Sequence, residues 1–260
     1  MAGFTAVFSN DTIPQHLSFR KKDTFTLEKD FLIEDILSDR LRIQRSTNKK
    51  FLQDKVFQQD EECIIIQEGV ILNLDILMKE YQQNDTFQLI KLLYHTKGGD
   101  FAGELRGDFS GLVYSKAENK CFVFTNHTGS KRIFYYLNNS FFIVSSDLGE
   151  ISHLLGELNI PKKLNIEASY LMLTCGFMLE DLTLIDDVKR LMPGNYLTYQ
   201  NKSVEIKEYF HLRKIYKTTD TKEQIIEKMD ELFANAVKRE FDKDIAYGYK
   251  HMATLSGGLD

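Results

Sequence analysis

Cysteine is scarce in this sequence, and the few cysteines lie far apart along the chain. The three cysteines are Cys63, Cys121 and Cys175, and no C-x-x-C pair occurs. An odd number of cysteines without a close pair argues against a disulfide framework and against a structural zinc site. We therefore expect a protein of the reducing cytoplasm.

The sequence also lacks an excess of one charge and any long apolar run. Its 33 basic and 38 acidic residues give a net charge of -5, with no long stretch of one sign. This distribution argues against a nucleic-acid footprint and against a patch for anionic membranes. The short apolar stretch at the N-terminus is not preceded by basic residues, as it would be in a signal peptide. No other stretch of apolar residues approaches the length needed to span a bilayer. We expect neither a signal peptide nor a membrane anchor, and a small molecule as the binding partner.

Proline is rare and tryptophan is absent, whereas other aromatic residues are common. The 260 residues include only three prolines but 19 phenylalanines and 12 tyrosines, and 43% of the chain is hydrophobic. Such a composition favours a strand-rich core packed with aromatic rings over a chain rich in linkers. The length suffices for one large domain, or for one domain with an appended piece.

The first two thirds of the sequence read mostly as strands. Residues 3–8 predict a strand, and residues 63–66 and 70–72 flank Glu68 and Gly69, which predicts either a tight hairpin or one strand with a glycine kink. Residues 87–95 carry apolar side chains at helical spacing before a glycine pair. Several strands follow from residue 105, with a turn at Asn138 and Asn139, and indicate an antiparallel meander.

The last third changes character. A helix is expected over residues 166–172 and a hairpin over residues 195–210. Thr221 and Gln224 form a capping box before an apolar stripe of helical period, which predicts an amphipathic helix. Residues 251–255 read as a buried strand that leads into a glycine loop. We therefore predict an α+β domain, a boundary near residues 210–220, and then the start of an α/β domain.

Several short motifs in this order resemble the asparagine synthetase family. They are GFTAVF at the start, EGVILN from Glu68, LRGDFSGLVYS from Leu105, NHTGSKRIFYY from Asn126, VSSDLGEI from Val144, RLMPGNYL from Arg190 and LSGGLD from Leu255. The resemblance covers essentially the whole chain. It implies a four-layer αββα sandwich of two antiparallel sheets over residues 1–212, of the glutaminase type with an N-terminal nucleophile. Residues 213–260 would then begin a Rossmann-like synthetase domain.

The resemblance implies a glutaminase site that this sequence does not complete. The family attacks glutamine with a cysteine after the initiator methionine, and its free amine is the base; this chain has Ala2 there. The family's oxyanion hole is an asparagine side chain beside a glycine N–H. Here Gly69 is kept, but Glu68 takes the asparagine position, and its carboxylate would repel the charge that the hole must stabilise.

The residues that grip glutamine in the family are less clearly placed. The aspartate that holds the substrate amine would fall on Thr86, with Asp85 one residue away. The arginine that clamps the substrate carboxylate would come from the SDRLRIQRS segment, where Arg42 and Arg45 both stay open. An engineered change from Cys to Ala would leave the rest of the pocket intact. Because Glu68 and Thr86 also depart from the family pattern, we favour natural loss, as in β-lactam synthetases and lasso-peptide cyclases.

The last residues match the family's pyrophosphate loop. Backbone N–H groups in such a loop close on the phosphates of ATP, and the matching positions here are Leu255, Ser256, Gly257, Gly258 and Asp260. The resemblance implies that Asp260 helps to hold Mg²⁺ pyrophosphate. ATP and Mg²⁺ would then be cofactors of a longer enzyme, of which this chain is an N-terminal piece or a truncated gene product that binds neither tightly.

Two hypotheses follow. In the first, the chain is a fragment of an asparagine synthetase-like, ATP-dependent amide-forming enzyme that no longer hydrolyses glutamine. In the second, it is a non-catalytic amidotransferase-like domain that acts as a scaffold or binds a small ligand. Glutamine binding separates a retained pocket from a collapsed one. A homodimer stays open under both hypotheses.

Overall fold

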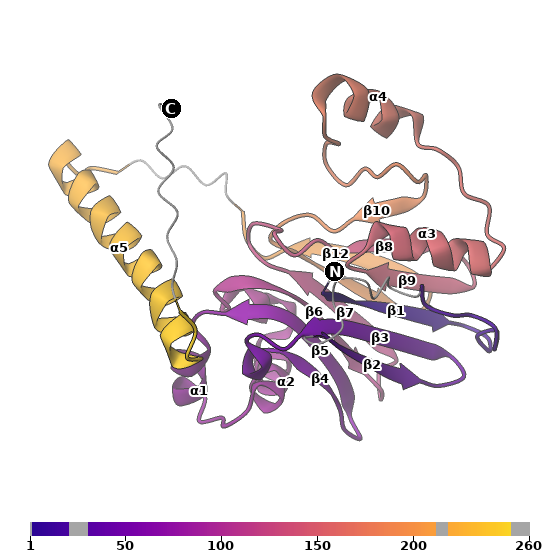
Figure 1. Cartoon of the computed structure of the whole chain (residues 1–260), viewed down its shortest axis with the longest axis horizontal. Helices are drawn as coiled ribbons and strands as arrows, with labels where there is room; N and C mark the ends of the chain where they lie inside the picture. Colours follow the sequence, from indigo (N-terminus) through magenta and orange to yellow (C-terminus); the bar gives the residue numbers. More distant parts are fainter. Residues whose placement is uncertain (1, 21–30, 212–217, 251–260) are drawn as a thin grey trace. The chain divides into compact units, whose positions relative to one another are not determined.

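The computed structural model describes residues 2–20, 31–211 and 218–250. The chain divides into two units, Met1–His211 and Leu212–Asp260 (Figure 1). The first unit holds two six-stranded sheets, in which every pair of neighbouring strands is antiparallel. Within the described residues, no helix has the length and apolarity needed to cross a bilayer.

The first sheet contains the start of the chain in its interior. Its strand order is β10-β8-β9-β1-β3-β2, so that β1 lies between β9 and β3. The bounds are β1 Gly3–Ser9, β2 Phe31–Leu37, β3 Leu41–Asn48, β8 Phe134–Leu137, β9 Phe141–Ser145 and β10 Val188–Arg190.

The second sheet has the order β12-β11-β7-β6-β5-β4. The bounds are β4 Val56–Gln59, β5 Cys63–Ile71, β6 Gly107–Ser115, β7 Lys120–Thr125, β11 Asn195–Gln200 and β12 Ser203–Glu208. The turn between β11 and β12 has positive φ at Asn201 and Lys202, which suits a two-residue hairpin and confirms the expected one.

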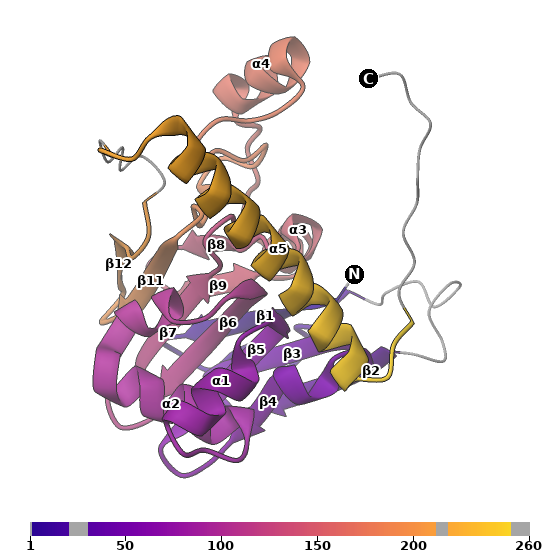
Figure 2. The same ribbon diagram turned by 90° about the vertical axis from the view of Figure 1, so that its left-hand side faces the viewer.

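Helices cover the outer face of each sheet. On the second sheet lie α1 (Leu74–Glu80), α2 (Thr86–Lys97) and the 3₁₀ turn η3 (Gly98–Gly103), and Figure 2 shows α1 and α2 beside β4 and β5. On the first sheet lies α3 (Leu148–Glu157). The layers are therefore helix, sheet, sheet and helix, and the expected αββα sandwich is confirmed. A short 3₁₀ turn, η2 (Leu52–Asp54), precedes β4, and α4 (Ile166–Cys175) projects beyond the layers (Figure 1).

The core between the two sheets follows from strand alternation. Side chains of successive strand residues point to opposite faces, so Phe4, Ala6 and Phe8 of β1 meet Ile64 and Ile66 of β5 between the sheets. The intervening residues of β1 and β5 face the outer helices. Each strand is thus buried on both faces, which explains its apolar sequence.

The structure corrects one expectation about the strands and decides between two alternatives for another. The strands after residue 105 do not form one meander: β6 and β7 pair in the second sheet, whereas β8 and β9 pair in the first. Because all four strands are apolar on both faces, their sequences could not show which sheet each one joins. Residues 63–71 form the single strand β5, in which Gly69 has a φ of 112°. The kinked-strand alternative is therefore right and the hairpin is wrong.

The described part of the second unit is one long helix, α5 (Lys222–Ala246). Thr221 accepts a hydrogen bond from the Gln224 N–H, and the Gln224 side chain accepts one from the Thr221 N–H. The predicted capping box is confirmed. The strand expected over residues 251–255 lies outside the described residues.

Candidate functional site

Ala2 lies at the end of the sandwich where β1 begins. It has the same strand parity as Phe4, Ala6 and Phe8, whose side chains lie between the sheets. Gly3 pairs with Ser46 of β3, so one further step of this register sets Ala2 opposite Thr47. The methyl side chain of Ala2 offers no nucleophile at this place.

The first residues of β1 are held closely to the rest of the first sheet. The Phe4 N–H donates to the Ser146 hydroxyl at 3.0 Å. A Cβ on Gly3 would lie 1.8 Å from that same oxygen, so only glycine fits the close approach. The chain before Phe4 is therefore led along a fixed path to the Ala2 position.

Glu68 and Gly69 occupy β5 near the same end of the sandwich. The Thr47 hydroxyl donates to Glu68 Oε2 at 3.0 Å, so Glu68 lies beside the residue that the register sets opposite Ala2. Gly69 has a positive φ, and a Cβ there would lie 1.9 Å from the Asp108 carbonyl oxygen. Position 69 therefore needs glycine because β5 and β6 pair closely there.

Arg45 is the arginine that the structure brings to Glu68. Both side chains are buried, and Arg45 Nη1 lies 3.4 Å from Glu68 Oε1. These two atoms form an ion pair, but neither has a hydrogen bond within the described residues. The Arg45 guanidinium also donates to the Glu34 carboxylate and lies 5.1 Å from the centre of the Phe57 ring. The guanidinium is therefore already engaged by two carboxylates of its own chain.

Arg42 does not reach this cluster. It lies on the opposite face of β3, because its sequence distance from Arg45 is odd. Its Nη1 donates to the Leu17 carbonyl oxygen at 2.5 Å. Of the two arginines that the sequence left open, only Arg45 lies beside Glu68.

Lys55 lies next to the same group of side chains, formed by Glu68, Arg45 and Thr47. Its Nζ donates to the Thr47 hydroxyl at 3.0 Å and to the backbone and side-chain oxygens of Asn48 at 2.8 and 2.6 Å. Burial lowers the pKa of Lys55, and the negative charge of Glu68 opposes this effect. The amine therefore belongs to the same charge network as the carboxylate.

Burial dominates the ionisation of Glu68. It raises the pKa of this carboxyl above its ordinary value, while Lys55, Arg45 and the Thr47 hydrogen bond act in the opposite direction. Lys131, from the loop after β7, adds a smaller positive influence on the same carboxyl. Three cations thus surround a carboxylate that has lost most of its water, which is the arrangement that a buried charge requires.

Asp85 and Thr86 lie at the start of α2, and within the described residues neither forms a hydrogen bond or ion pair with Glu68 or Arg45. Asp85 is the N-cap, and its carboxylate accepts from the Gln88 N–H at 2.9 Å. The Thr86 hydroxyl donates to the Gln53 carbonyl oxygen at 2.6 Å. Gln53 precedes Asp54 and Lys55, so Thr86 supports the turn that carries Lys55.

The remaining predicted residues lie outside the described part of the chain. These are the loop residues Leu255, Ser256, Gly257, Gly258 and Asp260. Among the residues that the structure does describe, no group of three or more His, Cys, Asp or Glu side chains could hold a metal ion.

Sequence reasoning missed Thr47, Lys55 and Glu34. Strand alternation could have found Thr47, since Leu41, Ile43, Arg45 and Thr47 share one face of β3 and the first two are core residues. No comparable signal marks Lys55, because it lies between a 3₁₀ turn and a short edge strand. Together the missed residues form a closed network of charges and hydrogen bonds around Glu68 and Arg45.

The model for the glutamine amidotransferase domain family matches residues 40–210. The chain is similar to a putative glutamine-hydrolysing asparagine synthetase of Methanocaldococcus jannaschii, with 28% identity over 218 residues, 80% of this chain and 41% of the relative. It is also similar to asparagine synthetase 2 of Bacillus subtilis, with 24% identity over 225 residues, 80% of this chain and 29% of that protein. The chain thus spans less than half of the length of these curated relatives.

Among solved structures, the chain is similar to the glutamine phosphoribosylpyrophosphate amidotransferase of B. subtilis in complex with ADP and GMP. The TM-score is 0.49 at 9% identity, and the match covers 80% of this chain and 49% of that one.

Proposed function

Since the chain belongs to the glutamine amidotransferase domain family, as an asparagine synthetase-like member of it, we propose that it no longer hydrolyses glutamine. We further propose that it serves an ATP-dependent, amide-forming enzyme. The enzyme would activate a substrate carboxylate with ATP and Mg²⁺ at the loop that contains Ser256 and Asp260. Its nitrogen nucleophile would be free ammonia or an amine, because this domain releases no ammonia from glutamine.

The observation that carries the proposal is the buried Glu68 carboxylate. Acyl transfer from glutamine needs a donor at this position, aimed at the negative oxygen that develops. Glu68 presents an acceptor instead, and the Thr47 hydroxyl is already directed to it. Losing a single oxyanion donor costs about 10² to 10³ in rate, and a carboxylate adds repulsion to that loss.

The contacts of Arg45 support the same proposal, because they bear on the binding of glutamine. The guanidinium that would clamp the α-carboxylate of glutamine is buried and is paired with the buried Glu68 and with Glu34, whose side chain is 36% exposed. An incoming carboxylate would have to compete with Glu34 or displace Glu68, and displacing Glu68 would leave a buried charge without its partner. Glutamine is therefore expected to bind poorly as well as to react slowly.

Restoring the site tests the proposal. We would compare Ala2→Cys, Glu68→Asn and the double variant, after verifying by mass that Met1 is removed so that the new thiol residue is N-terminal. Ammonia released from glutamine is the readout. We expect no hydrolysis by the wild type or either single variant, and measurable hydrolysis by the double variant only. Hydrolysis by Ala2→Cys alone would contradict the role given to Glu68, since it would mean that the pocket is intact.

A second experiment addresses the nitrogen source. The protein as it occurs in its own cells would be incubated with ATP, Mg²⁺ and aspartate as the probe carboxylate, and pyrophosphate release and amide formation would be measured. We expect amide formation with ammonium and none with glutamine. Amide formation with glutamine as the sole nitrogen source would contradict the proposal.

A further inference from the structure

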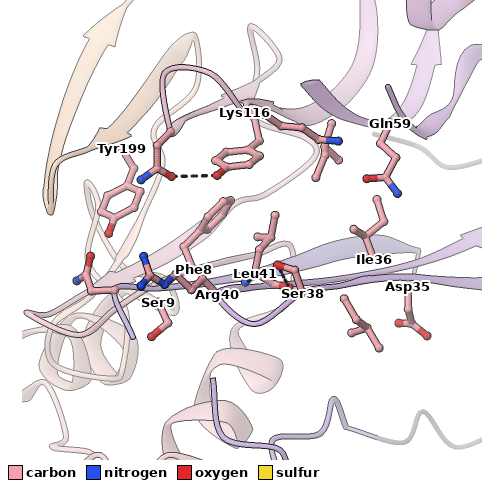
Figure 3. Close-up of a pocket in the computed structure, with 15 residues that line it drawn as sticks. Phe8, Ser9, Asp35, Ile36, Ser38, Arg40, Leu41, Gln59, Lys116 and Tyr199 are labelled. Atoms are coloured by element: carbon pink, nitrogen blue, oxygen red, sulfur yellow. Dashed lines mark hydrogen bonds between the residues drawn. The ribbon is translucent and has the colours of Figure 1, made fainter. Parts of the chain in front are cut away.

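A cleft opens between the two sheets at the end of the sandwich opposite Ala2 and Glu68. β1 runs from one end to the other, and its last residues, Phe8 and Ser9, line the cleft. The volume of the cleft is about 640 Å³, within the range of roughly 300 to 1,000 Å³ that is usual for small-molecule sites. Figure 3 shows Phe8 and Arg40 on the wall of the first sheet, facing Tyr199 and Lys116 on the wall of the second.

One wall of the cleft is aromatic and held in place. The Tyr114 and Tyr199 rings lie 5.4 and 6.1 Å from the Phe8 ring, centre to centre. Tyr199 also stacks on Phe142 at 4.3 Å, and the Tyr114 hydroxyl donates to Asn119 at 2.9 Å. Because these rings are already packed, a ligand that contacts them would pay little for ordering them.

The polar lining favours an anion. Arg40 is exposed, and its guanidinium makes no hydrogen bond or ion pair with any described residue. The Lys116 amine donates to the Asp60 carbonyl oxygen at 2.6 Å and forms no ion pair with a carboxylate of the described residues. The lining carboxylate, Asp35, already accepts a hydrogen bond from Gln44 at 3.0 Å. A guanidinium with free donors is well suited to two-point binding of a carboxylate or phosphate.

The backbone around Arg40 is fixed, although its guanidinium has no partner among the described residues. The Ser9 N–H donates to the Arg40 carbonyl oxygen at 2.9 Å, and the Ile13 N–H donates to the Asp39 carbonyl oxygen at 2.7 Å. The Tyr199 hydroxyl makes no hydrogen bond to another described residue, and Figure 3 shows Tyr199 at the same end of the cleft as Arg40, on the opposite wall. A donor hydroxyl and a guanidinium thus lie next to an aromatic wall.

We propose that this cleft is a binding site for a small anion that carries a planar ring, of about the size of a nucleoside monophosphate. The ring lies against the tyrosines, and the anionic group binds Arg40 and the Tyr199 hydroxyl. The site is separate from the Glu68 cluster, so binding here is independent of glutamine hydrolysis. The same chemistry could come from a nucleotide or from an aromatic carboxylate.

Calorimetric titration tests the site, with AMP and 4-hydroxybenzoate as probes in separate arms and with adenosine and inorganic phosphate as comparators. We expect saturable binding of at least one probe with a Kd below about 1 mM, and binding at least about tenfold weaker for adenosine and phosphate, which each lack half of the recognition. Binding of AMP would identify the ligand as a nucleotide, and binding of 4-hydroxybenzoate would identify it as an aromatic carboxylate. Absence of saturable binding in both arms would overturn the proposal.

Variants assign the binding to the cleft. Arg40→Gln is expected to weaken binding about tenfold or more, since a hydrogen bond to a charged group is worth about 1.5 to 3 kcal/mol. Tyr199→Phe is expected to weaken it about two- to tenfold, and the ring contact is kept. Arg132→Gln, at an exposed arginine outside the cleft, is the matched control and should leave the Kd unchanged. Binding that Arg40→Gln leaves unaltered, in a variant with wild-type circular dichroism, would also overturn the proposal.

Discussion

Removing the Arg45 guanidinium should destabilise the first unit strongly. Arg45→Gln leaves the buried Glu68 carboxylate without its guanidinium partner, and breaking one side of a buried pair costs about 3 to 5 kcal/mol. Thr47 and Lys55 remain beside the carboxylate, so we expect the lower end, about 3 kcal/mol. Glu68→Gln should cost no more than about 1 kcal/mol, because Arg45 keeps Glu34 as its partner and Thr47 can still donate to an amide oxygen.

The same variant should acquire a pH dependence of defined sign. Burial raises the pKa of Glu68 in the folded protein, and Arg45 opposes that rise, so its removal raises the pKa further. The folded state then binds more protons than the unfolded state, and stability increases as the pH falls through the folded pKa toward the ordinary value of 4.5. Arg45→Gln should therefore lose most stability at neutral and alkaline pH and recover part of it in acid.

Urea unfolding followed by near-ultraviolet circular dichroism of the tyrosines measures this effect. With a slope of about 3 kcal/mol/M, a loss of about 3 kcal/mol shifts the midpoint by about 1 M. The double variant Arg45→Gln, Glu68→Gln should be more stable at neutral pH than Arg45→Gln alone, because the uncompensated charge is gone. A cost below about 1 kcal/mol for Arg45→Gln, or a double variant as unstable as Arg45→Gln, would refute the reasoning.

Two further predictions concern backbone fit and thiol reactivity. Gly69→Ala should cost several kcal/mol in urea unfolding, because its Cβ would collide with a carbonyl oxygen and its φ is positive. Gly156→Ala, in the helix α3, where an added Cβ would lie no closer than 3.6 Å to another atom, should be neutral or stabilising by up to about 1 kcal/mol, and equal costs would contradict the prediction. In native protein a thiol reagent at pH 8 should modify the exposed Cys175 first, since burial raises the pKa of Cys63 to about 11 and that of Cys121 well above its usual value. Mass spectrometry of the labelled peptides measures this order, and rapid native labelling of Cys121 would count against it.

Much of the fold could be predicted from local signals. The strand at the start of the chain, the α2 helix, the hairpin of β11 and β12, and the capping box at Thr221 each depend on residues close in sequence. The pairing of β8 and β9 with the first sheet depends on contacts with β1, more than 130 residues away in the chain. Because strands buried on both faces show no polar side, their sequences carry little information about their sheet.

The candidate site was predicted in part. The motif positions placed Ala2, Glu68 and Gly69, and the structure adds that Glu68 is buried and paired. The choice between Arg42 and Arg45 needed the register of β3 against β1, which the sequence left unclear. The role of Lys55 could not be predicted, because the fold of the turn before β4 is what brings its amine to Thr47, next to Glu68.

The most direct test of the account is a glutaminase assay on the wild-type protein as it occurs in its own cells. Ammonia release from glutamine would be measured by a coupled enzyme assay, with heat-denatured protein as the blank. The account predicts a rate no higher than the blank, because Ala2 supplies no nucleophile and, in the proposal, Glu68 takes the oxyanion position. Saturable hydrolysis that requires native protein would contradict it.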